Sequence, residues 1–225
     1  AYDPYGNASE PITSEKFTVG SYTPAPGTVA PKPELLDLVI NDMGEPSDAT
    51  GTFVIEKGQT EPLPYFDNTY QSNAVQFQGN NNQFYKADYT NTQKVSDAML
   101  NEITYEVLFR CNSINSGWFC PLSSQHDGGQ GIELDNGRIT FYLGVQNGES
   151  NEYNVANTNV YASPGSFYHV VATYNKAEGM VRIYVDGFPA GEMAVDGEPT
   201  LPVEGSTWVA IGGDASKGGD LTCDG

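Results

Sequence analysis

The chain has 225 residues and a formal net charge of -19, because 29 Asp and Glu stand against 10 Lys and Arg. Such an acidic chain repels phosphate backbones and anionic lipid surfaces, which excludes nucleic acid as a partner. Charged residues are only 17% of the chain, whereas 25 Gly, 14 Pro, 14 Tyr and 10 Phe are present. These residues are typical of short strands and tight turns, so the composition predicts an all-β protein.

Residues 1–33 have no sustained apolar periodicity, and the run Tyr22–Pro33 is rich in proline. This pattern predicts an extended linker over 1–33 and a folded domain over 34–225. No stretch approaches the ~18 apolar residues of a membrane-spanning helix. The N-terminal residues lack the regions of a signal peptide, and the acidic, Asn- and Tyr-rich composition with few lysines favours an exported protein. The pairing of Cys111, Cys120 and Cys223 is left open.

Apolar runs alternate with turn residues throughout residues 34–225. They predict strands over 35–40, 52–56, 74–78, 103–110, 118–122, 131–134, 138–145, 167–174, 180–185 and 208–211. A short helix is predicted over 93–101, and hairpin turns over 135–137 and 175–179. Since no repeat of fixed period is present, we expect an antiparallel sandwich of two sheets.

Alternation within the strands assigns side chains to faces. The predicted core comprises Ile103, Tyr105, Val107, Phe109, Ile132, Leu134, Ile139, Phe141, Leu143, Ile183 and Trp208. The residues between them point outward, so we expect one outer face that carries Glu106, Arg110, Glu133, Thr140 and Tyr142.

The segment 167–191, FYHVVATYNKAEGMVRIYVDGFPAG, resembles a hairpin of laminin-G-like, concanavalin A-like lectin/glucanase domains. The strand AVQFQG at 74–79 and the strand WVAIGG at 208–213 are similar to two further strands of that family. The resemblance covers about residues 34–220 and implies a jelly-roll sandwich of two curved antiparallel sheets. Domains of this kind have one more strand after the WVAIGG position, so we expect the domain over 34–225 to lack its last strand. The alternatives are that residues 12–23 of the same chain, or a second chain, fill that position.

Leu35–Gly44 and Phe84–Tyr89 are similar to patterns in laminin-G-like modules of secreted Bacteroidetes proteins, some of which also carry a calcineurin-like phosphoesterase domain. This resemblance implies an accessory module of a multidomain protein that is secreted, periplasmic or on the cell surface. The metal-binding motifs of the phosphoesterase are absent from the chain. A structural or interaction role beside such an enzyme is therefore one alternative function.

Catalysis has weak support in the sequence. Retaining glucanases of this fold share an E-x-D-x-x-E strand, which holds two carboxylates about 5 Å apart. Here Glu133-Leu-Asp135 is followed by Asn-Gly-Arg, so the motif is incomplete and Asp135 is expected in the turn. Glu106 and Glu133, expected on neighbouring strands, are the remaining candidate pair of a divergent glycoside hydrolase. His126 is expected in a solvated loop and His169 in a structural role, since no nucleophile motif accompanies them.

Residues suited to binding sugars are more numerous in the sequence than catalytic motifs. Sugars are held by aromatic faces together with amide and carboxylate hydrogen bonds. Candidate ligand-binding residues are Trp118, His126, Tyr142, Tyr153 and Arg110, with Asn147, Asn151, Asn154, Asn157 and Asn159 expected in the intervening loops. Candidate calcium ligands are Asp127, Asp135, Asn136 and Asp214, although so acidic a chain has many loop carboxylates without any metal. The leading hypothesis is a non-catalytic carbohydrate-binding module.

Overall fold

A computed structural model describes residues 33–79, 83–114, 118–203, 206–213 and 225 of the chain. The chain divides into the units Ala1–Pro33 and Glu34–Gly225, and the architecture below is that of the second unit. The predicted linker, Cys223 and Asp214 lie outside the described residues, and the missing last strand stays a prediction.

Strands are the main secondary structure of the second unit. Its first half contains β1 (Leu38–Ile40), β2 (Pro46–Asp48), β3 (Ile55–Lys57), β4 (Leu63–Asp67), β5 (Ser72–Gln76), β6 (Tyr85–Asp88), α1 (Gln93–Asn101), β7 (Glu102–Arg110) and β8 (Trp118–Gln125). Its second half contains β9 (Gly129–Asp135), β10 (Arg138–Asn147), β11 (Ser150–Tyr161), β12 (Phe167–Asn175), β13 (Met180–Val185), β14 (Phe188–Ala194), β15 (Glu198–Pro199) and β16 (Trp208–Ile211).

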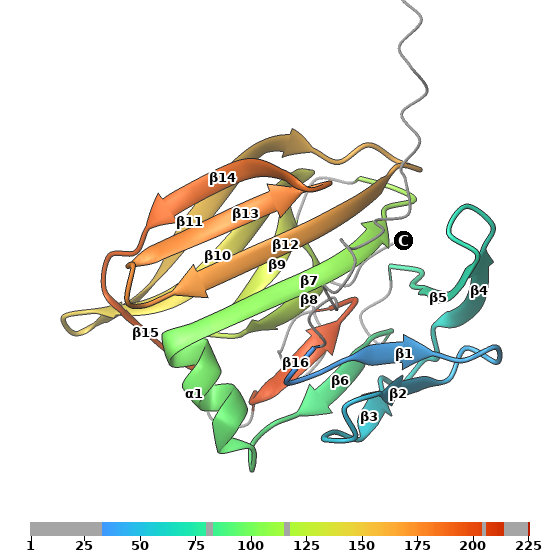
Figure 1. Cartoon of the computed structure of the whole chain (residues 1–225), viewed down its shortest axis with the longest axis horizontal. Coiled ribbons are helices and arrows are strands. Elements are labelled where there is room, and N and C mark those ends of the chain that lie inside the picture. Colours follow the sequence, from blue (N-terminus) through green and yellow to red (C-terminus); the bar gives the residue numbers. More distant parts are fainter. Residues whose placement is uncertain (1–32, 80–82, 115–117, 204–205, 214–224) are drawn as a thin grey trace, which may run out of the picture. The chain divides into compact units, whose positions relative to one another are not determined.

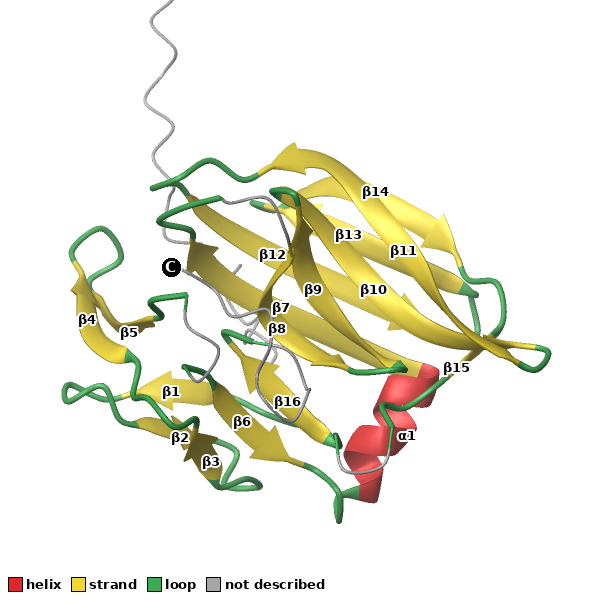
Figure 2. Ribbon diagram, turned by 180° about the vertical axis from the view of Figure 1, so that it is seen from behind, coloured by secondary structure: helices red, strands yellow, loops and turns green. Residues whose placement is uncertain are grey.

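The strands form two principal sheets. The larger sheet has the order β11-β10-β9-β8-β16-β6-β3, with β15 paired to β10, and the smaller sheet has the order β14-β13-β12-β7. In Figure 1 the smaller sheet lies in front of strands β9, β10 and β11 of the larger sheet. Figure 2 views the molecule from the opposite side, so these three strands face the reader. Two further pairs, β1-β2 and β4-β5, form separate two-stranded sheets. The predicted antiparallel two-sheet sandwich is confirmed.

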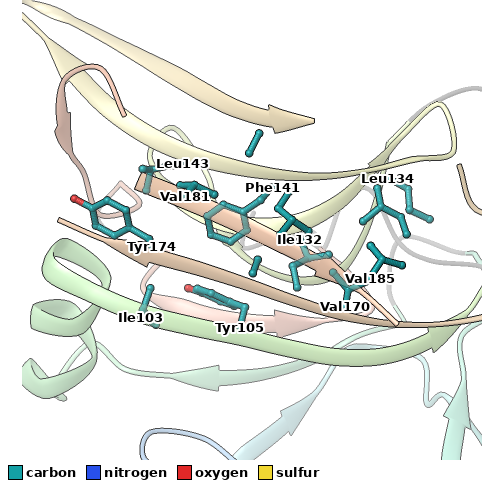
Figure 3. Close-up of a cluster of buried hydrophobic side chains, with 14 of the residues drawn as sticks. Ile103, Tyr105, Ile132, Leu134, Phe141, Leu143, Val170, Tyr174, Val181 and Val185 are labelled. Carbon is teal, nitrogen blue, oxygen red and sulfur yellow. The ribbon is translucent and has the colours of Figure 1, made fainter. Parts of the chain in front are cut away.

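The core lies between the two principal sheets (Figure 3). Phe141 from the larger sheet is 0% exposed, and its ring centroid lies 5.8 Å from that of Tyr105 in the smaller sheet. Ile183 is also buried, while Phe109 is half-buried against the same core. Full burial of a side chain of this size stabilises the fold by about 1.5–3 kcal/mol, so these facing side chains hold the sheets together.

The predicted helix is present over the predicted residues as α1. It buries Val95 and Met99, and it ends because Glu102 adopts an extended backbone and begins β7. The carbonyl of Met99 accepts a hydrogen bond of 2.8 Å from Nε2 of buried Gln130. This bond satisfies one of the carbonyls that the last helical turn leaves without a helical partner.

Both predicted hairpins are also confirmed. The β9–β10 turn places Asn136 at φ 49° and Gly137 at φ 83°. Positive φ angles at both central residues are what a tight Asn-Gly turn requires. The second hairpin pairs β12 with β13 from Val170–Val185 to Asn175–Met180.

The asparagine-rich segment and Trp208 depart from the predictions. The asparagine-rich segment expected as loops forms β11, which pairs along the length of β10, while Asn147 is the last residue of β10. Asparagine has a low strand propensity, but the long backbone pairing with β10 outweighs this preference. Trp208 is half-buried and not in the central core, and Nζ of Lys86 lies 4.9 Å from its ring centroid.

Candidate functional site

Two tyrosines meet on the outer face of the larger sheet. Tyr142 comes from β10 and Tyr153 from β11, and their ring centroids lie 6.1 Å apart at an interplanar angle of 72°. Phe141 and Leu143 point into the core, so alternation directs Tyr142 away from it. Gly144 stands opposite Tyr153, which makes the two tyrosines diagonal neighbours on one face. Two of the predicted ligand-binding residues are therefore in contact.

The hydroxyl groups of both tyrosines stay protonated at neutral pH. Burial raises the pKa of Tyr142 to about 12, and the nearby carboxylates of Glu133 and Asp135 act in the same direction. Burial also raises the pKa of Tyr153, whose hydroxyl accepts a 2.8 Å hydrogen bond from the backbone N–H of Gly128. This anchor fixes the ring of Tyr153, and protonated phenols both donate and accept hydrogen bonds.

Glu133 shares this face but is only 1% exposed. Its neighbours Ile132 and Leu134 belong to the core, so the predicted outward direction is correct. Although Glu133 points away from the core, it and the opposite Thr140 are both buried. Asp135 is the last residue of β9 and not part of the turn, and it is half-buried.

A second polar and aromatic group lies at the other end of the same face. Nε of Arg138 donates a 2.9 Å hydrogen bond to the Tyr161 hydroxyl, and the guanidinium carbon lies 5.1 Å from the ring centroid. Nη1 of Arg138 also donates to Oδ1 of Asn157 at 3.4 Å. Tyr161 is 55% exposed. Sequence reasoning did not select Arg138, although the alternation that directs Tyr142 outward directs Arg138 outward as well.

The structure places two more predicted ligand residues at this sheet. Trp118 begins β8 and pairs with Asp135, at the end of the face that carries Arg138. His126 lies in the turn before β9 and its N–H donates to the carbonyl of Gly128, next to the Tyr153 anchor. Four of the five predicted ligand residues therefore map to the larger sheet or its edge.

Arg110 does not belong to this face, which corrects the expectation of a single outer face. It is the last residue of β7 in the smaller sheet. Its guanidinium carbon lies 5.2 Å from the ring centroid of Tyr65 and 5.1 Å from that of Phe167. Arg110 therefore packs against two aromatic rings at the end of the smaller sheet.

The predicted catalytic pair is not formed. Glu106 lies on β7 of the smaller sheet, whereas Glu133 lies on β9 of the larger sheet. Both side chains point away from the core that separates the two sheets. The prediction that they share a face on neighbouring strands is therefore wrong.

The calcium candidates are also separated. Asp127 precedes β9, while Asp135 and Asn136 lie at its far end. A strand extends by roughly 3.3 Å per residue, so about 20 Å of strand lies between them and no single ion reaches both ends. Nδ2 of Asn136 donates a 2.7 Å hydrogen bond to Asp135. Within the described ranges, no group of three or more His, Cys, Asp or Glu is arranged to hold a metal ion.

Comparison with protein families gives one match. The family model for the concanavalin A-like lectin/glucanases superfamily matches residues 84–225, and it confirms the resemblance read from the sequence. No curated protein matches the chain significantly.

Solved structures share the fold at low sequence identity. The binding domain of botulinum neurotoxin DC in complex with rat synaptotagmin II is 14% identical, with a TM-score of 0.56 and coverage of 77% of this chain. The same binding domain in complex with SialylT is 13% identical, with a TM-score of 0.54 and coverage of 78%. A structure reported for botulinum neurotoxin type C, whose cell entry depends on two ganglioside molecules, is 13% identical, with a TM-score of 0.54 and coverage of 79%. The matched part is 42%, 42% and 45% of those three chains, respectively.

Proposed function

Because the chain belongs to the concanavalin A-like lectin/glucanase superfamily, we propose that it is a non-catalytic carbohydrate-binding module of an exported multidomain protein. The observation that carries the proposal is the tyrosine face of the larger sheet, defined by Tyr142, Tyr153, Arg138 and Tyr161. It combines aromatic rings with fixed hydrogen-bonding groups, which is the chemistry that saccharides need.

The tyrosine face is fixed before a ligand arrives. Tyr153 is anchored to Gly128, and Arg138 is stacked on Tyr161 and bonded to Asn157. Side chains that are already ordered lose little further freedom when they bind, so weak contacts with a sugar contribute more net affinity. The Tyr161 ring is exposed enough to stack against the C–H surface of a pyranose.

The separation of the carboxylates supports a binding role over hydrolysis. Both glycosidase mechanisms need two carboxyl groups that flank one glycosidic bond, at most about 10 Å apart. Glu106 and Glu133 lie on different sheets, and Glu133 is buried. The solved relatives add support by analogy, since two of them are described with SialylT or ganglioside molecules.

Export and further domains rest on separate observations. The acidic, asparagine-rich composition with few lysines favours a secreted, periplasmic or cell-surface protein. In the described part of the chain, no helix is long and apolar enough to cross a membrane. The proline-rich run Tyr22–Pro33 has the composition of an extended linker, which supports attachment to a further module.

A glycan array tests the proposal directly. The wild-type chain is compared with Tyr142→Ala and Tyr161→Ala, and with Tyr184→Ala as the matched control on the smaller sheet. We expect bound glycans whose signal falls in the first two variants and persists in the control. Repeating the array with a chelator tests whether calcium takes part. An array on which the folded wild-type chain binds no glycan would overturn the proposal.

A further inference from the structure

A small depression lies outside the family-matched residues, between the β1–β2 turn and the β4–β5 hairpin. It encloses about 280 Å³ of empty space, including its open mouth, and its lining includes Asn41, Asp42, Pro64, Phe66 and Asn73. Figure 2 shows the β4–β5 hairpin beside β1 and β2. Neither the family match nor the tyrosine face accounts for this depression.

One wall of the depression is an exposed aromatic ring. Phe66 stands opposite Asn73 in the β4–β5 pair, and cross-strand partners share a face of the sheet. Phe66 is 49% exposed, whereas the adjacent Tyr65, which also lines the depression, has its ring 5.2 Å from the guanidinium carbon of Arg110. The hairpin therefore presents an open phenyl ring and a carboxamide side by side.

The opposite wall supplies a carboxylate. Nδ2 of Asn73 donates a 2.8 Å hydrogen bond to Oδ1 of Asp42, in the turn between β1 and β2. One hydrogen of the Asn73 amide, its oxygen and the second oxygen of Asp42 remain for a ligand. The pair therefore offers a donor next to acceptors, which matches two adjacent hydroxyl groups.

The turn that carries Asp42 is held in place. Oδ1 of Asn41 accepts hydrogen bonds of 2.9 Å from the backbone N–H groups of Met43 and Glu45. Gly44 has φ 78°, and an added Cβ would lie 2.6 Å from Cγ of Pro64, so the turn packs closely on the hairpin. A preformed site binds without the cost of ordering its loops.

We infer that this depression binds a terminal unit of a neutral saccharide, a conclusion that rests on the proposed carbohydrate-binding function. One C–H face of the sugar ring stacks on Phe66. One hydroxyl group donates to Asp42, and its neighbour accepts from the amide of Asn73. The depression is thus a second saccharide site, separate from the tyrosine face.

Local charge determines the ligand class. Asp42 contributes a negative charge, and no Lys or Arg is among the residues that line the depression. Nearby Lys57 is already paired with Glu45 at 2.8 Å and with Glu61 at 2.9 Å. A sugar carboxylate would meet uncompensated repulsion in a chain of net charge -19, so neutral sugars are favoured over sialic or uronic acids.

Amide-detected NMR titration of the whole chain tests this inference. The probes are methyl glycosides of mannose, galactose and N-acetylglucosamine, compared with those of glucuronic acid and N-acetylneuraminic acid. We expect at least one neutral probe to shift the side-chain amide of Asn73 and the backbone amides of Met43 and Phe66. The two acids should leave these signals in place.

Variants assign the shifts to the site. Phe66→Ala and Asp42→Asn should each raise the dissociation constant of the neutral probe by about tenfold, because one removes the stacking surface and the other the charged acceptor. Phe188→Ala is the matched control, since Phe188 is also an exposed phenylalanine but lies on β14. The Phe188→Ala variant should bind the neutral probe with the same dissociation constant as the wild type.

The outcomes separate this inference from the proposed function. Array binding that depends on Tyr142 and Tyr161, with no probe shifting Asn73, overturns the second site and leaves the proposed function standing. Shifts at Asn73 that survive both Phe66→Ala and Asp42→Asn, or that are larger for the acids, also overturn it. A folded chain that binds no saccharide in either assay overturns both.

Discussion

Nε2 of His169 lies 2.7 Å from Oε1 of Glu106, on the outer face of the smaller sheet. The two residues come from neighbouring strands, β12 and β7. This contact gives Glu106 a structural partner on the side of the sandwich opposite to Glu133. His169 is thus the nearest partner of the Glu106 carboxylate, and Glu133 lies too far away to share a substrate with it.

The first prediction concerns catalysis. We expect no release of reducing sugar from common β-glucans, because hydrolysis requires two carboxyl groups at one glycosidic bond. Wild type, Glu106→Gln and Glu133→Gln should be equal to the buffer blank in a reducing-sugar assay. Turnover in the wild type that disappears in Glu133→Gln would contradict the separation of the two residues.

The second prediction concerns the core. Phe141→Ala should lower the free energy of unfolding by about 3–5 kcal/mol and Ile183→Ala by about 2–5 kcal/mol, because both side chains are fully enclosed. Phe109→Ala should cost less than Phe141→Ala, since Phe109 is half-buried. Urea unfolding of the three variants measures the order, and a larger loss for Phe109→Ala would contradict the observed packing.

The strand faces could be predicted because alternation is a local property of the sequence. Alternation within their own strands predicts Tyr105 and Phe141 in the core, and their rings face each other across it. Which sheet a strand joins depends on pairing with strands that are distant in the sequence, so it is not a local property. The sequence places Glu106 and Glu133 outward, but nothing in their neighbourhood indicates that β7 and β9 lie in different layers.

Strand β11 shows a second limit of local reasoning. Its asparagines favour turns in isolation, and the strand exists because β10 supplies a long run of backbone partners. The aromatic ring and hydroxyl of Tyr153 make it a candidate sugar-binding residue, and its contact with Tyr142 depends on that pairing. The depression at Asp42 and Asn73 joins residues 31 positions apart through side chains, which no sequence pattern revealed.

The third prediction concerns Asp48, which is buried at the end of β2. Its carboxylate accepts hydrogen bonds from the backbone N–H groups of Asp37, Thr50, Thr52 and Phe53 and from the Thr50 hydroxyl. Asp48→Asn should lower the free energy of unfolding by about 1–3 kcal/mol, because an amide group then faces backbone donors that need an acceptor. Glu149→Gln, at an exposed position, is the control and should have no effect.

The effect of Asp48 should depend on pH. Burial alone would raise the pKa of this carboxyl, but the hydrogen bonds outweigh burial and lower the pKa below its ordinary 3.8. The stabilisation is therefore complete above that value and is lost as the pH falls through the lower pKa of the folded state. Urea unfolding at successive pH values should show the difference between wild type and Asp48→Asn shrinking only below about pH 3.8. A difference that vanishes already near neutral pH would contradict this account.

The fourth prediction concerns the alkaline limit of stability. Burial raises the pKa of Tyr85, Tyr89 and Tyr142 from 10.0 to about 12. In the unfolded chain these phenols ionise near pH 10, whereas in the folded chain they stay neutral up to about pH 12. Their contribution to the free energy of unfolding is therefore complete below pH 10 and is lost as the pH rises towards 12. Tyrosinate absorbance and circular dichroism, recorded together, should show these residues ionising as the fold is lost. Tyr85→Phe removes one ionisable group, so its free energy of unfolding should fall less than that of the wild type between neutral pH and about pH 12. An equal fall in the two proteins would contradict the assignment.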